Sequence, residues 1–261
     1  MSEETEKITD LRSYKVVKDN QIIQNVRKEK YTLSVLEQKA LLYIISMIKP
    51  PKEDSNGVID APVYEYEFEI AKFCKICGIN NRSGKNYENI RTALKNISDS
   101  SFWLRSGDGR QMLFRWFSSA TIIEGEGKIT IEISPNVMPY LFNLSDNFTT
   151  YELYYVLALS STHSITLYEL LKSYSFKKNI ALTLEELRDN MMLGTKYPLF
   201  KDFRRYVLDV AVKEINGYTD INVYWNPIKT GRSVTAIEFN IEMKNSMDRA
   251  VTRTKVLEEL S

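Results

Sequence analysis

The sequence predicts an α+β protein in which one order of helices and strands occurs twice along the chain. Two short helices are expected to end at Gly78 and Gly194, and a turn and a longer amphipathic helix follow each of them. Two strands then flank a Gly-Arg turn, Gly109–Arg110 in the first half and Gly231–Arg232 in the second. A helix, a turn, a second helix and a β-hairpin form a helix-turn-helix with a β-wing. We therefore expect two winged-helix domains in tandem.

Composition and charge bound the kind of protein. The 261 residues are 43% hydrophobic and 26% charged, which is ordinary for a globular chain with a buried core. The N-terminus is acidic and polar, unlike a signal peptide, and no apolar run approaches the ~18 residues that span a membrane. We expect a soluble, cytoplasmic protein without membrane contact. The expected segments are a flexible N-terminus (1–15), a first winged helix (16–143), a second winged helix (144–243) and a charged tail (244–261).

The first half begins with a helix at Ser34, which forms a capping box with Glu37 and is followed by apolar residues at helical spacing. Pro50–Pro51 stops this helix, and alternating aromatic residues predict a strand over 64–68. After the helix-turn-helix, the Asp-Gly turn favours a hairpin between strands 101–106 and 111–123. A last strand is expected over 128–134.

The second half is expected to contain helices over 149–161 and 164–176, a strand over 180–184 and a short helix over 184–194. The longer helix, 200–216, carries an apolar stripe at helical spacing. That stripe consists of Phe200, Phe203, Val207, Val210, Ala211 and Ile215. Strands over 220–225 and 233–243 complete this half.

The longer helix of the second half is the main candidate for DNA recognition. Lys201 and Arg205 lie opposite its apolar stripe and Arg204 flanks it, near the N-terminal end where recognition helices touch bases. Lys196 in the preceding turn could hold the flanking phosphates, as could Lys229 and Arg232 in the wing. A solvated basic face on an ordinary helix is the simpler alternative. The net charge of +1 and the pI near 7.6 count mildly against a nucleic-acid binder.

The corresponding helix of the first half is less basic. Lys85, Asn86 and Asn89 face outward and Arg82 lies in the turn, but Glu88 sits among them. Asparagine can read adenine, so these residues are also candidates for DNA binding. A plain exposed face explains them about equally well.

Three patterns resemble catalytic or metal sites, but each of them lacks residues that such a site needs. Cys74 and Cys77 form a Cys-x-x-Cys pair, but no second pair accompanies them, so core packing is the better interpretation. The stretch 78–86 resembles a P-loop but has the wrong spacing and lacks the Ser or Thr that would hold magnesium. His163 begins a helix and has no nucleophile motif to serve. We expect no enzyme activity, metal or cofactor.

Four stretches resemble the initiator replication proteins of iteron-containing plasmids. They are VVKDNQII with LSVLEQKALLYIIS, then ISPNVMPYLFNLSDNFTTYELYYVLALSSTHSITLYELL, then LEELRDNM with YPLFKDFRRYVLDVAVKEIN, and last TDINVYWNPIKTGRSVTAIEFNI. The resemblance implies two winged helices with pseudo-twofold similarity that bind direct repeats at a plasmid origin. Monomers would open the origin and recruit host replication proteins. Dimers joined through the first domain would repress their own gene, and Lys201, Arg204 and Arg205 would supply most base contacts.

Two other functions use the same fold. A transcription regulator would bind a palindromic operator without melting DNA. A protein-interaction module would show little salt-sensitive DNA binding.

Overall fold

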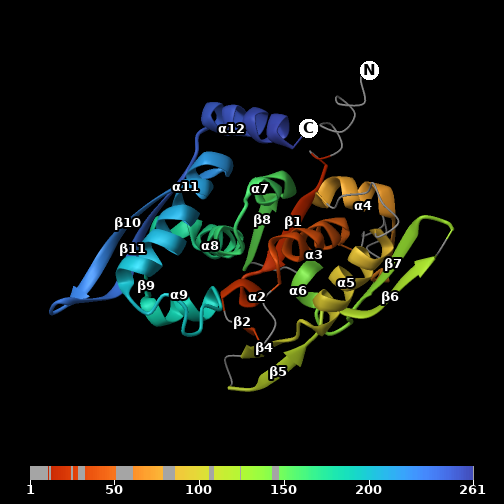
Figure 1. The fold of residues 1–261 in the computed structure, drawn as a ribbon, viewed down its shortest axis with the longest axis horizontal. Helices are drawn as coiled ribbons and strands as arrows, with labels where there is room; N and C mark the ends of the chain where they lie inside the picture. Colours follow the sequence, from red (N-terminus) through yellow and green to blue (C-terminus); the bar gives the residue numbers. More distant parts are fainter. Residues whose placement is uncertain are drawn as a thin grey trace, which may run out of the picture. The chain divides into compact units, whose positions relative to one another are not determined.

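The computed structural model describes residues 11, 13–24, 26–28, 33–50, 61–78, 86–105, 109–123, 125–142 and 147–260. The chain forms two compact units, Leu11–Leu153 and Tyr154–Ser261 (Figure 1). This division lies later than the predicted break after residue 143. The reason is that β8 (Phe148–Glu152), expected as part of a helix, pairs antiparallel with β1 (Lys15–Asp19) of the first unit. Its residues alternate between buried and partly exposed, as strand residues do.

The first unit contains the predicted capped helix α3 and the first helix-turn-helix, α4 and α5. The Ser34 Oγ accepts the Glu37 N–H at 3.3 Å, and a Glu37 carboxylate oxygen accepts the Ser34 N–H at 2.7 Å. Gly78 ends α4 in the left-handed conformation with φ 71°, as predicted. The elements are α2 (Gln21–Gln24), β2 (Val26–Lys28), α3 (Val35–Met47), β3 (Glu65–Glu69), α4 (Ile70–Cys77), α5 (Asn86–Asp99), β4 (Phe102–Arg105), β5 (Gln111–Phe114), β6 (Phe117–Ile123), β7 (Lys128–Ile133) and α6 (Pro139–Phe142).

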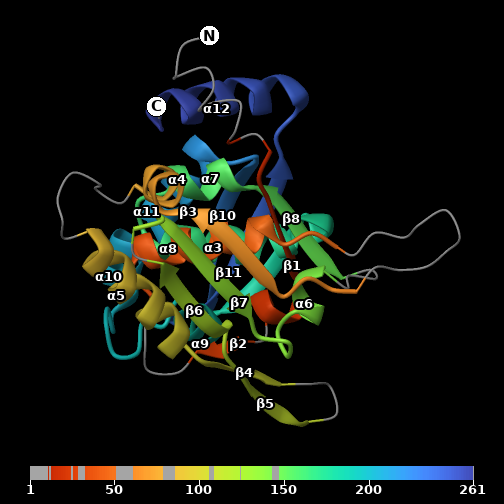
Figure 2. The same cartoon turned by 90° about the vertical axis from the view of Figure 1, so that its right-hand side faces the viewer.

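The expected single strand over 111–123 is wrong, because the chain changes sheets at Arg115–Trp116. β5 pairs with β4 in the sheet β2-β4-β5, whereas β6 pairs with β7 in the sheet β3-β7-β6. Trp116 is buried, its ring lies 4.7 Å from that of Phe102, and its carbonyl accepts the Ser134 N–H. The two hairpins are separate in Figure 2, where β4–β5 lies below β3, β7 and β6.

The second unit repeats the order of the first. Its elements are α7 (Leu153–Ala158), which crosses the boundary, α8 (Thr162–Ser173), β9 (Asn179–Thr183), α9 (Leu184–Asn190), α10 (Phe200–Phe203), a π-helical turn (Arg204–Leu208), α11 (Asp209–Tyr218), β10 (Ile221–Thr230), β11 (Ser233–Met243) and α12 (Ser246–Glu259). In each unit the strand before the helix-turn-helix pairs with the second strand of the wing, β3 with β7 and β9 with β11. Both units are therefore winged helices.

This topology corrects the predicted repeat. The first-unit equivalent of the β10–β11 wing is β6–β7, whose turn includes Gly125 and Gly127, and not the hairpin with Gly109–Arg110. The β4–β5 hairpin is an additional element between the recognition helix and the wing. The Gly-Arg dipeptides of the two halves are thus not in equivalent positions.

The charged segment after residue 243 folds as α12 and packs on α11 of the same unit. Thr252, Val256 and Leu257 are its buried residues. The buried Lys244 Nζ donates to the carbonyl of Asn216 at 2.7 Å and to Thr252 Oγ1 at 3.1 Å, which ties the start of α12 to the recognition helix. Within the described ranges, no helix combines the length and apolarity needed to cross a bilayer.

Candidate DNA-binding surface

The turn of the second helix-turn-helix is held by Arg188 of α9. Its Nη1 donates to the Lys196 carbonyl at 2.9 Å, and its Nη2 donates to the Tyr197 carbonyl. Tyr197 has φ 54°, a left-handed conformation that costs a residue with a side chain of order 1–3 kcal/mol. The guanidinium of Arg188 also lies 5.7 Å from the ring centroid of Phe203. One side chain therefore fixes the turn and touches the helix that follows it.

The recognition helix is not a regular α-helix. The Asp209 N–H bonds to the Arg204 carbonyl, five residues earlier, which makes the π-helical turn over Arg204–Leu208. Its buried residues are Phe203, Val207, Leu208, Ala211 and Ile215. The five-residue step from Phe203 to Leu208 matches the wider turn.

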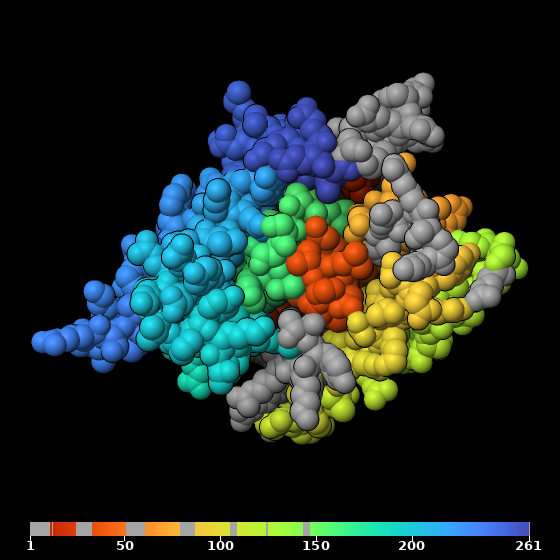
Figure 3. Space-filling view, viewed as in Figure 1, coloured from red at the N-terminus to blue at the C-terminus, as the bar shows by residue number. Residues whose placement is uncertain are grey.

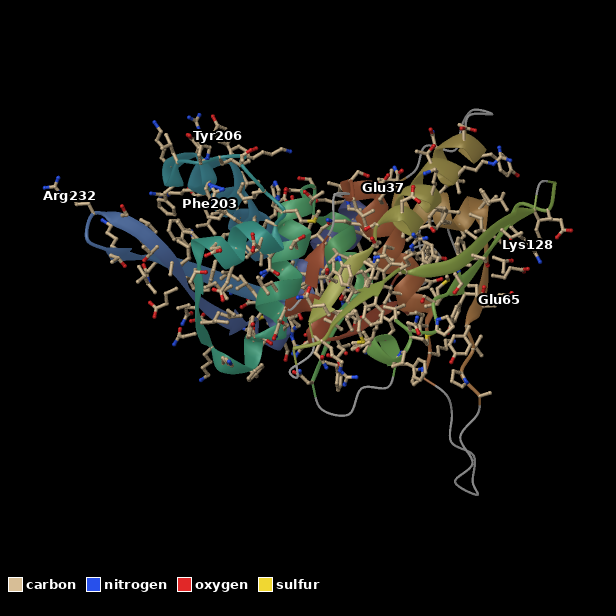
Figure 4. All side chains as sticks on the ribbon, turned by 90° about the horizontal axis from the view of Figure 1, so that it is seen from below. Glu37, Glu65, Lys128, Phe203, Tyr206 and Arg232 are labelled. Carbon is tan, nitrogen blue, oxygen red and sulfur yellow. The ribbon has the colours of Figure 1, made fainter. Side chains whose placement is uncertain are left out.

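This turn changes the predicted apolar stripe. Val210 was expected in the stripe but is 40% exposed, because the extra residue in the π turn places Leu208 inward instead. Lys201, Arg204, Arg205 and Tyr206 are all exposed. Figure 4 shows Tyr206 on the outer side of the helix and Phe203 on the inner side.

The three predicted recognition cations are in two different environments. The Arg204 Nε donates to a carboxylate oxygen of Asp209 at 3.1 Å, and its guanidinium lies 5.3 Å from the ring centroid of Trp225 on the wing. Lys201 and Arg205 form no ion pair within the described part of the chain. Their charges are thus available to phosphates or base edges, whereas Arg204 is already bound to the protein.

The wing of the second unit adds cations at its tip. β10 and β11 pair along their full length, whereas β9 pairs only with residues 236–240 of β11. The end of the hairpin that carries the turn therefore projects beyond β9 (Figure 3). Lys229 and Arg232 are exposed at this end, and Gly231 makes the turn with φ 63°. Figure 4 shows Arg232 at the extremity of the hairpin. Lys196, in the helix-turn-helix turn, is exposed as well.

Only some of the predicted DNA-binding residues of the first unit lie in the described part of the chain. Arg82 and Lys85 lie outside the described residues, as does the P-loop-like stretch after Gly78. Asn86 is the first residue of α5, and its side chain is not described. Asn89 is exposed on α5.

The first wing and its sheet carry the opposite charge. Glu65, Glu67 and Glu69 share the exposed side of β3, and Glu132 on β7 lies directly opposite Glu65. Lys128 is bound to Glu67, with 2.7 Å between its Nζ and the carboxylate oxygen. An acidic surface repels phosphates, so the recognition helix and wing of the second unit, with their exposed cations, are the stronger candidate for DNA binding.

Two of the three patterns that resemble catalytic or metal sites, the cysteine pair and His163, lie in the described residues. Cys74 and Cys77 are buried in the first unit, and burial raises the pKa of both thiols. No group of histidine, cysteine and carboxylate side chains suited to a metal occurs in the described segments. His163 is the second residue of α8, and its N–H donates to Ser161 Oγ at 3.2 Å, so Ser161 is the cap.

Sequence reasoning missed three aromatic residues at this surface, Tyr197, Tyr206 and Trp225. Trp225 faces the recognition helix and also meets Phe200, 6.4 Å between ring centroids. Phe203 and Val207 are four residues apart in the predicted stripe, which already leaves Arg204, Arg205 and Tyr206 outside it. The exposure of Tyr206 was therefore predictable, whereas its contact with Tyr197 was not.

Two helix-turn-helix units, each followed by a β-wing, define a tandem winged-helix protein. The chain belongs to the initiator replication protein family. The family model for "Initiator Replication protein, WH1" matches residues 15–172, and that for "Initiator Rep protein, WH2" matches residues 183–241. The resemblance and the fold class inferred from sequence are thereby confirmed.

Individual relatives agree with this assignment. A replication initiation protein of Escherichia coli is 24% identical over 225 residues, which are 84% of this chain and 68% of the relative. The PI protein of Escherichia coli is 30% identical over 132 residues, which are 44% of this chain and 43% of the relative. The crystal structure of the Pi initiator protein in complex with iteron DNA matches with a TM-score of 0.69 at 19% identity, covering 90% of this chain and 99% of that chain. At this identity the match shows a shared fold.

Proposed function

We propose that this chain initiates plasmid replication by binding directly repeated sites at an origin through its second winged helix. The observation that carries the proposal is a pair of exposed cations on the recognition helix, Lys201 and Arg205, which form no ion pair with the described residues, together with Lys229 and Arg232 on the adjoining wing. The similarly folded Pi initiator has been crystallised with iteron DNA, which supports the same mode of binding here. In this proposal the protein acts by binding and has no catalytic step.

We further infer a division of labour between the units. The acidic sheet face of the first unit is unsuited to phosphates, so this face serves contacts with protein: a second copy of the chain and host replication proteins. The recognition helix of the first unit, with Asn89 exposed, remains a candidate for additional DNA contacts. Monomers would open the origin, and dimers would repress the chain's own gene. The resemblance to the family supports these roles.

Binding to restriction fragments of the replicon that encodes the chain, with competitor DNA and a salt series, tests the proposal. We expect tight, competitor-resistant binding to a fragment with tandem repeats. Equal, weak binding to all fragments would favour a protein-interaction module, and tight binding to a palindrome without melting would favour a transcription regulator.

The variant Arg205→Ala tests the recognition helix itself. If Arg205 reads a base, its loss should weaken specific binding by about 1–3 kcal/mol and leave binding to random DNA nearly unchanged. Lys213→Ala is the matched control, because Lys213 is an exposed cation further along the same helix. An equal loss on random DNA would assign Arg205 to phosphate, and unchanged binding would remove it from the interface.

A further inference from the structure

A stacked pair of tyrosines lies among the recognition cations. The rings of Tyr197 and Tyr206 are 5.7 Å apart between centroids and 26° from parallel. Tyr206 is 50% exposed, and the guanidinium of Arg205 lies 5.3 Å from its ring centroid. A large, neutral, half-exposed ring therefore lies directly beside a cation that is available to DNA.

Several separate features hold this pair in place. Tyr197 adopts a left-handed backbone, and Arg188 binds the carbonyls of Lys196 and Tyr197. Tyr206 lies within the π-helical span Arg204–Leu208, exposed between Arg205 and the buried Val207. A side chain that is fixed before binding loses little conformational entropy when a ligand packs against it. The fixed ring of Tyr206 is therefore well suited to contacting a ligand such as DNA.

The chemistry of the ring limits what it can recognise. The hydroxyl of a tyrosine can donate to a phosphate or a base, whereas the face of its ring is apolar. In the major groove, the apolar feature that distinguishes one base from the others is the C5-methyl group of thymine. We propose that Tyr206, positioned by Tyr197, reads a thymine through that methyl group. This assignment rests on the proposed function.

Uracil substitution tests the proposal, because uracil lacks only the methyl group. The full-length chain is first used to select binding sites from a random double-stranded DNA library. Each thymine of the enriched site is then replaced by uracil. Removing a methyl contact should weaken wild-type binding about fourfold at one or two positions, the equivalent of roughly 0.8 kcal/mol.

Three variants make the result specific. Tyr206→Ala should lose the preference for thymine over uracil at those positions and keep other base preferences. Tyr206→Phe should keep the preference, because the hydroxyl is not needed. Tyr224→Ala should bind as the wild type does: Tyr224 is 55% exposed but neighbours Trp225 on the strand and so points to the opposite side of the sheet. Thermal unfolding of each variant confirms that it is folded.

The possible failures are distinguishable. A site that binds equally well with uracil at every position overturns the role of Tyr206 and leaves the proposed function standing. Loss of the preference in Tyr206→Phe also overturns it, because the hydroxyl would then make the contact. A library from which no sequence is enriched overturns both the role of Tyr206 and the proposed function.

Discussion

The guanidinium of Arg204 lies over the indole ring of Trp225, 5.3 Å from the ring centroid, and so joins the recognition helix to the wing. Because Asp209 also binds Arg204, the side chain is held from two sides. Arg204 is therefore better suited to fixing the angle between helix and wing than to reading a base.

Arg204→Ala should lower the free energy of unfolding by about 0.5–1 kcal/mol, the usual worth of an exposed cation–π contact. It should also weaken binding to all DNA sequences alike. Arg205→Ala also removes a cation–π contact, with the neighbouring Tyr206, but no hydrogen bond, so it should lower the free energy of unfolding by less than Arg204→Ala does. Urea unfolding and DNA titration measure both effects. If Arg204→Ala alters the preference for one base pair only, Arg204 reads that base directly.

Removing either cation of the second wing should reduce the salt dependence of DNA binding. Each of Lys229→Ala and Arg232→Ala should lower the slope of log affinity against log salt by about 0.9 if the side chain contacts a phosphate. Lys128→Ala is the control in the first wing, where Glu67 already binds the lysine. A similar change of slope in all three variants would show that overall charge, and not position, governs binding.

Arg188→Ala should disorder the helix-turn-helix turn of the second unit. Its loss deprives the carbonyls of Lys196 and Tyr197 of their donor, which should cost about 1–3 kcal/mol in unfolding free energy. Arg188→Lys keeps the charge but not the forked donor geometry, so it should recover only part of the loss. Hydrogen exchange over residues 191–199 should increase in both variants. Full recovery by lysine would mean that charge alone holds the turn.

Removing one partner of the buried pair Lys172 and Asp220 should destabilise the second unit. Both side chains are 10% exposed, and Asp220 also accepts the Tyr168 hydroxyl at 2.8 Å. Asp220→Ala should cost about 3–5 kcal/mol, because it leaves the lysine charge buried without its partner. The double change Lys172→Met with Asp220→Ala should recover part of this. If the double variant is less stable than Asp220→Ala alone, the buried lysine is stabilised by other contacts.

His163, the single histidine, should make stability depend on pH. Burial, with a smaller contribution from the charge of Lys196, lowers the pKa of His163 below its ordinary 6.5. The unfolded chain therefore takes up a proton at a higher pH than the folded chain, so stability should fall as the pH drops through 6.5 toward the lowered pKa. Unfolding of the wild type and His163→Gln between about pH 7.5 and about pH 5 isolates this effect, because other groups titrate in both. Parallel profiles would contradict it.

Local signals predicted much of the fold. The capping box at Ser34, the left-handed Gly78 and the apolar period of α5 depend on neighbouring residues, and the structure has all of them. Pairing between distant strands was harder. Nothing near Thr149 or Trp116 in the sequence indicates that β8 pairs with β1, or that β5 and β6 belong to different sheets.

The candidate site shows the same contrast. The exposed positions of Lys201 and Arg205 followed from an α-helical period, whereas the exposure of Val210 and the burial of Leu208 did not, because one π turn shifts that period. Arg204 contacts Trp225 because the wing lies beside the recognition helix. Tyr206 stacks on Tyr197 because the helix-turn-helix turn brings Tyr197 close to the helix. Such contacts follow from tertiary structure, and a linear pattern does not contain them.

The acidic sheet face of the first unit affects how the protein partitions between its origin and the other DNA in a cell. A plasmid origin competes with a vast excess of other sequence, and nonspecific attraction scales with the positive charge that meets the backbone. Carboxylates such as Glu65 and Glu132 reduce that attraction at this face, while the recognition helix and wing of the second unit expose cations. Fewer molecules are then sequestered on bulk DNA, so a given occupancy of the origin is reached with fewer copies of the protein.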